Sequence, residues 1–79
     1  MENMSISETL KKVLKYYPAR PFMTSDVLGL YEDDGYDITD TRVINNVSRH
    51  LTTLHKQRYL KVIDTIRIAG IKHVYMVRQ

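Results

Sequence analysis

The 79-residue sequence contains no cysteine, no tryptophan and no long apolar run. Without cysteine, a disulfide scaffold and a zinc site with thiolate ligands are excluded. The longest apolar stretch, residues 27–31, is far shorter than the ~18–20 residues that a membrane-spanning helix needs. No charged-then-apolar leader opens the chain, so we expect a cytoplasmic protein with no membrane association. At this length we expect a single domain over residues 1–79.

Acidic residues are almost missing from the second half of the chain. Residues 41–79 hold eight Lys and Arg but only one acidic residue, Asp64, whereas residues 1–40 hold eight acidic and four basic residues. The net charge of +3 therefore conceals a first half at −4 and a second half at +7. This polarity indicates either a polyanionic partner for the basic half or a basic surface that is simply solvated.

No residue pattern indicates catalysis or metal binding. The sequence has no glycine-rich phosphate loop and no nucleophile–base–orienter set, so we expect no enzyme activity. His50 and His55 are separated by about 140° on a helix, which prevents them from sharing one ion as i, i+4 partners do. We therefore expect no metal, no cofactor and no small-molecule ligand.

A first helix is predicted over residues 6–16. Ser5 and Glu8 form a capping-box pattern at its start. Pro18 ends it, because the residue before a proline avoids the helical conformation. The apolar residues that recur at helical spacing are Ile6, Leu10, Val13, Leu14 and Tyr17.

A second helix is predicted over residues 25–32, with Thr24 or Ser25 as its N-cap and Asp26 in its first turn. Gly35 ends it, since glycine readily adopts the left-handed conformation that often follows a helix. Its buried side is expected to consist of Val27, Leu28 and Tyr31.

A third helix, predicted over residues 41–57 and capped by Thr39 or Asp40, has the most informative pattern. Its apolar face is expected to consist of Val43, Ile44, Val47, Leu51 and Leu54. Its opposite face is expected to carry Arg42, Asn45, Arg49, Thr52 and Lys56, with Asn46 and Thr53 alongside. An ordinary exposed helix would interleave acidic residues with these bases, and this helix contains none.

After the third helix the hydrophobic period changes from about 3.6 to about 2 residues, which predicts a β-hairpin over residues 60–78. A two-residue turn is expected at residues 69–70. The register set by this turn would place like charges opposite each other across the hairpin. Such pairs are normally unfavourable, so their presence would indicate a nearby anion that offsets the repulsion. The pairs are Arg67 with Lys72 and Lys61 with Arg78.

This order of elements is that of a winged helix-turn-helix. Two segments carry the resemblance, residues 46–60 (NVSRHLTTLHKQRYL) and residues 74–77 (VYMV). They are similar to the recognition helix and the second wing strand of bacterial and archaeal regulators of the broad MarR and ArsR type. Residues 22–27 (FMTSDV) are similar to the opening of the second helix in that superfamily. The resemblance covers almost the whole chain and implies an α+β fold, a single domain of three helices followed by a two-stranded wing.

The chain departs from the family pattern at two places. Arg58 stands where the family usually has glycine after the third helix, so this helix must end without a left-handed glycine or continue slightly further. The connection of residues 35–40 is longer and more acidic than the tight turn of the minimal motif.

Residue chemistry and the resemblance together predict a transcriptional regulator that binds double-stranded DNA. Arginine suits the major-groove edge of guanine, and asparagine suits that of adenine. On the third helix the predicted contacts are Arg42, Asn45, Asn46 and Arg49 to bases, and Thr53 and Lys56 to phosphate. On the wing, Arg67 and Lys72 are expected to reach a minor groove or its phosphates, as in similar proteins, unless they simply keep a sheet edge soluble.

A lone winged helix contacts few base pairs, so we expect that tight binding requires a homodimer or a neighbouring protein. The first helix, or Tyr16 and Tyr17 at its end, is the expected dimer surface. The alternative function is a protein-interaction module within a larger assembly, with the acidic first half as its docking face.

Overall fold

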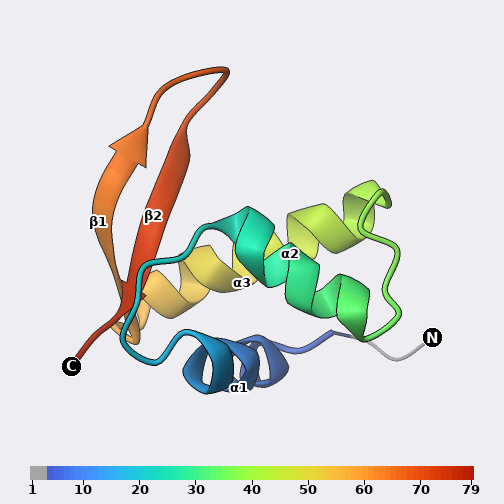
Figure 1. Cartoon of the computed structure of the whole chain (residues 1–79), viewed down its shortest axis with the longest axis horizontal. Coiled ribbons are helices and arrows are strands. Elements are labelled where there is room, and N and C mark those ends of the chain that lie inside the picture. Colours follow the sequence, from blue (N-terminus) through green and yellow to red (C-terminus); the bar gives the residue numbers. More distant parts are fainter. Residues whose placement is uncertain (1–3) are drawn as a thin grey trace.

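The computed structural model describes residues 4–79 (Figure 1). Its elements are α1 (Ile6–Tyr16), α2 (Thr24–Asp33), α3 (Thr41–Lys56), β1 (Leu60–Ile66) and β2 (Lys72–Val77). The two strands pair in one antiparallel hairpin. Three helices followed by a two-stranded hairpin is the α+β layout of a winged helix, so the predicted fold class is confirmed. Within the described residues, no helix has the length and apolar character needed to cross a bilayer.

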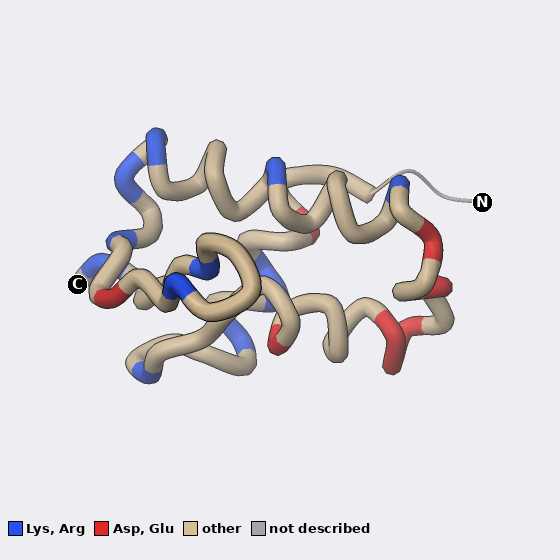
Figure 2. The backbone as a smooth tube through the Cα atoms, turned by 90° about the horizontal axis from the view of Figure 1, so that it is seen from above, with Lys and Arg blue, Asp and Glu red and all other residues tan. Residues whose placement is uncertain are grey.

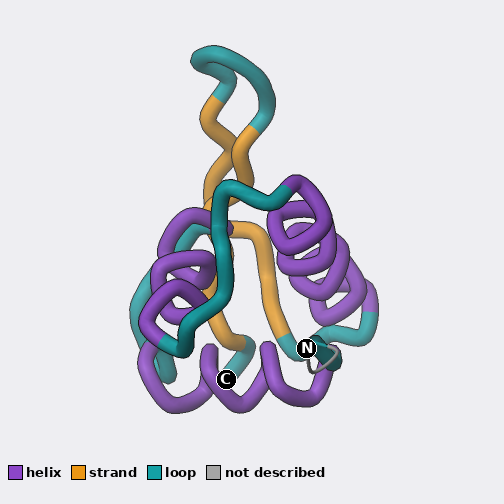
Figure 3. The backbone as a smooth tube through the Cα atoms, turned by 90° about the vertical axis from the view of Figure 1, so that its right-hand side faces the viewer, coloured by secondary structure: helices purple, strands orange, loops and turns teal. Residues whose placement is uncertain are grey.

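Helix α3 is the element against which most others pack. It contacts α1, α2 and β1, and α2 also contacts β2. The hairpin extends away from the helices at one end of the molecule (Figure 3). The buried apolar core therefore lies between the inner face of α3 and its neighbours, and it consists of Val13, Phe22, Val27, Tyr31, Val47, Leu51, Leu54, Leu60, Tyr75 and Val77.

The starts of α1 and α3 follow from local side-chain chemistry. The Ser5 hydroxyl accepts a hydrogen bond from the backbone N–H of Glu8 at 3.1 Å. The Asp40 carboxylate accepts one from the backbone N–H of Arg42 at 2.9 Å. Ser5 and Asp40 are thus the N-caps of these helices, as predicted.

The start of α2 differs from the prediction. Met23 occupies the N-cap position, so the expected cap at Thr24 or Ser25 is wrong. The Met23 side chain has no strong hydrogen-bond acceptor, but the Asp26 carboxylate accepts from the Met23 backbone N–H at 2.8 Å. The acidic residue of the first turn therefore satisfies the helix start, and the two hydroxyl side chains are left for other contacts.

Arg58 adopts the left-handed conformation that glycine usually supplies after the third helix, with a φ of 67°. Its backbone N–H donates to the His55 carbonyl, and that of Tyr59 donates to the Leu54 carbonyl, both at 3.0 Å. A non-glycine residue in this conformation costs about 1–2 kcal/mol. The chain thus keeps the usual end of the helix with an arginine in place of glycine.

A β-bulge between residues 62 and 64 shifts the register of the hairpin. Lys61 lies opposite Met76, and Ile66 lies opposite Lys72. The loop, which is longer than the expected two-residue turn, moves the register by one residue at the tip, and the extra residue of the bulge moves it by one more toward the base of the hairpin. The like-charge pairs predicted between Arg67 and Lys72 and between Lys61 and Arg78 are therefore wrong, and the anion that they would indicate loses its support.

The loop of the hairpin is also longer than predicted. The strands stop at Ile66 and resume at Lys72, so residues 67–71 form the loop in place of a two-residue turn. Ala69 and Gly70 have positive φ angles of 57° and 114°, and they reverse the chain at the tip.

The segment before α2 ties the hairpin to the helices. Phe22 and Tyr75 exchange two backbone hydrogen bonds, at 2.9 and 2.8 Å, and their rings stack with centroids 5.9 Å apart. Both residues are buried. This isolated bridge fixes the base of the wing against the segment before α2.

A buried polar cluster joins the three helices. The Thr9 hydroxyl of α1 lies 2.6 Å from the Tyr31 hydroxyl of α2 and 2.8 Å from Nδ1 of His50 in α3. The three groups are satisfied when Tyr31 donates to Thr9 and Thr9 donates to a neutral His50. Burial raises the pKa of Tyr31 to about 12, and burial, followed by the charge of Arg49, lowers the pKa of His50. Because buried polar groups need their partners, the cluster fixes how α3 crosses α1 and α2.

The free energy of unfolding should fall as the pH drops below about 6.5, because folding hinders protonation of His50. Its folded pKa lies below the ordinary value of 6.5, so the folded state binds fewer protons than the unfolded state near that pH. The stabilisation is therefore complete above about pH 6.5 and is lost as the pH falls toward the lowered pKa. Urea unfolding at about pH 7.5 and about pH 5.5 measures the loss. This loss of unfolding free energy should be smaller in His50→Asn and unchanged in His73→Asn, because His73 is exposed. An undiminished loss in His50→Asn would contradict the role given to His50.

Candidate nucleic-acid interface

A groove of about 640 Å³ lies between the start of α2, one side of α3 and the wing. It is lined by Met23, Thr24, Ser25 and Leu28 from the second helix and its cap, Ile44, Asn45, Ser48 and Thr52 from the third helix, and Ile71, Lys72, His73 and Tyr75 from the wing. None of these lining residues is acidic. An anionic ligand in the groove therefore meets hydroxyl, amide and ammonium groups and no like charge on its walls.

Helix α3 presents two parallel rows of polar side chains. The neutral row lines the groove and consists of Asn45, Ser48 and Thr52. The cationic row consists of Arg42, Arg49 and Lys56. Its members are seven residues apart, close to two helical turns, so the row runs nearly straight for about 21 Å and lies about 70° around the helix from the neutral row. Figure 2 shows these basic positions spaced along α3.

Arg49 points toward Asn46 in the free protein. Its Nη2 atom donates to Oδ1 of Asn46 at 3.0 Å. Asn46 is only partly exposed and does not line the groove. An exposed hydrogen bond of this kind contributes about 0.5–1.5 kcal/mol, so a base edge or a phosphate can replace it.

Arg42 is paired with the carboxylate that caps its own helix. Its Nη2 atom lies 3.0 Å from Oδ2 of Asp40, and the arginine side chain is 85% exposed. The hydrogen bonds from Arg42 lower the pKa of Asp40. Ion pairs this exposed add little stability, so the arginine can exchange this carboxylate for a phosphate.

The structure brings only part of the predicted site together. Asn45 and Lys72 line one groove, and the cationic row borders it. Asn46 and the partly buried Thr53 lie beyond the cationic row, on the side away from the groove. Arg67 is exposed in the loop of the hairpin.

Sequence reasoning gave no place at this surface to Ser48 or to His73. Ser48 stands three residues after Asn45 and four before Thr52, a spacing that puts the three on one side of a helix. His73 reaches the groove from β2. Ile44 also lines the groove and is partly exposed, although its spacing predicted a place in the core.

Charge is divided between the two ends of the molecule. Figure 2 shows the acidic positions gathered toward the end where α2 passes into α3, while basic positions predominate at the opposite end and on the hairpin. An anion approaching the groove is therefore attracted by the hairpin and by the last turn of α3, and is repelled from the connection between the helices.

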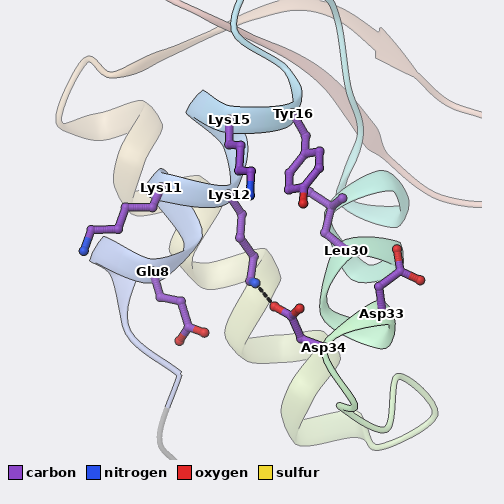
Figure 4. A pocket seen from close by; sticks show the side chains of 8 residues that line it. All are labelled: Glu8, Lys11, Lys12, Lys15, Tyr16, Leu30, Asp33 and Asp34. Carbon is purple, nitrogen blue, oxygen red and sulfur yellow. Dashed lines mark hydrogen bonds and ion pairs between the residues drawn. The ribbon is translucent and has the colours of Figure 1, made fainter.

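A second cavity, of about 280 Å³, lies between α1 and α2 (Figure 4). Its walls mix cations with carboxylates, and Lys12 forms an ion pair with Asp34 across it. Ligand pockets usually exceed about 300 Å³ and are mostly apolar. This small, internally paired cavity is a weaker candidate site than the groove.

Comparison of the chain with known protein families, with curated proteins and with solved structures gives no match. The groove, the two rows on α3 and the charge of the hairpin are therefore the features on which a function can be based.

Proposed function

We propose that this chain binds double-stranded DNA as a small transcriptional regulator in the cytoplasm. In this proposal α3 enters the major groove, whose width of about 12 Å admits a helix, and the wing lies on the neighbouring backbone or minor groove. The observation that carries the proposal is the groove without acidic lining, bordered by the cationic row of α3.

In this proposal the two rows of α3 have different roles in binding. The neutral row faces the bases, with Asn45 in the half of the helix that usually meets base edges. Arg49 lies between this row and Asn46, and it reads guanine once it releases the amide. Arg42 and Lys56, at the two ends of the cationic row, bind phosphates and fix the register of the helix on the duplex.

A homodimer formed through α1 would supply the second half-site. Ile6, Leu14 and Tyr16 are 37%, 46% and 46% exposed, and exposed apolar side chains favour burial against a second copy. Tyr17 is not part of this surface, because its ring packs 5.4 Å from the ring of Phe22. In this proposal regulation comes from occupancy of the DNA.

Titration of a random duplex pool at low and at moderate salt tests the proposal. DNA binding predicts a steep fall in affinity as salt rises, and selection from the pool should yield a shared sequence. If no duplex binds even at low salt, DNA binding is wrong, and a protein-interaction module docked through its acidic end is favoured.

Replacing both wing cations, Arg67→Ala with Lys72→Ala, should weaken binding to all duplexes about equally. Each lost phosphate contact should lower the magnitude of the log–log salt slope by about 0.9. The matched control is Lys11→Ala with Lys15→Ala, which removes the same charge from α1 beside the second cavity and away from the groove. Titrations over a salt series measure both slopes. A fixed slope with loss of preference at one base pair would make the wing a base reader.

A further inference from the structure

The tip of the wing exposes the two least covered large apolar side chains of the described residues. Ile68 is 79% exposed and Ile71 is 65% exposed, whereas the other exposed large apolar residues range from 37% to 50%. Both isoleucines belong to the loop of residues 67–71. Hairpin edges usually carry charged or turn-forming residues, so two uncovered isoleucines at the tip call for a binding partner.

The backbone of the loop presents these side chains at the end of a narrow projection. The positive φ angles of Ala69 and Gly70 reverse the chain between them, so Ile68 enters the tip and Ile71 leaves it. Figures 1 and 3 show the loop extending beyond every helix. Because Ile71 also lines the groove beside α3, the tip is continuous with the surface proposed to hold DNA.

The charge around the tip indicates what it meets. Arg67 precedes the first isoleucine and Lys72 follows the second, and there is no acidic residue between Thr65 and the end of the sequence at Gln79. The partner must therefore combine an anionic exterior with an apolar interior that a narrow projection can reach. A duplex minor groove has both features, phosphates along its edges and stacked bases at its floor.

We propose that the wing tip enters the minor groove of the duplex held by α3 and that Ile68 and Ile71 act as a wedge at one base step. This inference rests on the proposed function and adds a consequence to it, namely a bent duplex. The wedge partly unstacks the step and bends the DNA toward the major groove, while Arg67 and Lys72 bind the flanking phosphates. Bound sites should carry a flexible pyrimidine–purine step, which is the easiest to kink, at a fixed distance from the bases read by α3.

The test measures DNA shape as well as affinity. A duplex selected by the wild-type chain is labelled at both ends for energy transfer and, at its pyrimidine–purine step, with a fluorescent adenine analogue that brightens on unstacking. Wild type should shorten the end-to-end distance and brighten the analogue. Ile68→Ser with Ile71→Ser should still bind, roughly tenfold more weakly, with an unchanged salt slope and with both signals lost.

Two control variants test whether the signals depend on apolar side chains at the tip. Ile68→Leu with Ile71→Leu preserves an apolar wedge and should restore both signals. Ile63→Ser removes an isoleucine that is 45% exposed on β1 and outside the loop, and it should leave both signals intact. All variants should melt like wild type, because the substituted side chains lie outside the core.

Each outcome separates the wedge from the function on which it rests. A wild-type complex with straight, fully stacked DNA, or an equal bend in the double serine variant, overturns the wedge and leaves DNA binding standing. Failure of wild type to bind any duplex overturns the proposed function itself. Binding to vesicles of anionic phospholipid that depends on the two isoleucines would make the tip a membrane-surface anchor and would overturn the wedge.

Discussion

Leu51→Ala should destabilise the chain by about 2–5 kcal/mol. The Leu51 side chain is fully buried on the inner face of α3, within the core that this helix shares with its neighbours. Truncation removes buried apolar surface and leaves a cavity that a close-packed core fills only in part. A domain of this length has a total stability near the low end of about 5–15 kcal/mol, so the loss approaches complete unfolding.

Urea unfolding measures this effect, and the chain offers a matched control. Leu14 of α1 is 46% exposed, so Leu14→Ala should cost less than about 1 kcal/mol at a protein concentration low enough to keep the chain monomeric. Leu54→Ala, at a residue 1% exposed, should resemble Leu51→Ala. If the leucines of α3 cost no more than Leu14, the packing of α3 against the core is wrong.

The helices were predictable because their signals are local. Ser5 and Asp40 act on backbone N–H groups two or three residues away, which a sequence pattern records. The start of α2 was missed because the Asp26 carboxylate accepts from the backbone N–H of Met23, a residue whose own side chain is not a conventional cap. Asp26 therefore indicated the start of α2 better than the usual preference for a hydroxyl residue at the N-cap did.

The wing was predictable as a hairpin but not in its register. One extra residue between positions 62 and 64 moves every later side chain of β1 relative to β2. A strict alternation rule cannot locate such a bulge, because β-branched residues occupy both faces of this strand. The predicted pair of Arg67 with Lys72 failed because the loop is longer than two residues, and the pair of Lys61 with Arg78 failed because of the loop and the bulge together.

The polar cluster had a signal in the sequence that was not used. Thr9 stands three residues after Ile6 and four before Val13, and His50 has the same relation to Val47 and Leu54. A polar residue at such a position lies on the buried face of its helix and needs a partner there. Which partner it meets depends on how the helices cross, and local spacing does not record that.

The same limit applies to the proposed site. Helical spacing separates the neutral row from the cationic row of α3. It does not say which row adjoins the wing, because that depends on where β2 and Phe22 pack. Variants of Asn45 and of Arg49 therefore test which of the two rows contributes to reading the sequence.

Arg49→Ala should lower affinity for the selected duplex by roughly ten- to hundred-fold and flatten preference at one or two base pairs. A bidentate contact from arginine to guanine is worth about 1–3 kcal/mol of discrimination, which corresponds to that range. Thermal stability should hardly change, because the side chain is exposed and its bond to Asn46 lies at the surface. Arg49→Lys keeps the charge but loses the planar fork, so it should restore nonspecific binding without specificity.

Paired titrations of the selected and of a scrambled duplex, at one salt concentration, measure these effects. Arg78→Ala is the control, since this arginine is exposed beyond the end of β2 and does not line the groove, so its loss should weaken both duplexes slightly and equally. An equal and larger loss in Arg49→Ala would make Arg49 a phosphate contact. If Asn45→Ala then loses preference at an adenine, base reading belongs to the neutral row, which already faces the groove. If neither variant loses affinity, α3 does not contact the DNA, because the two rows that it presents to solvent then have no part in binding.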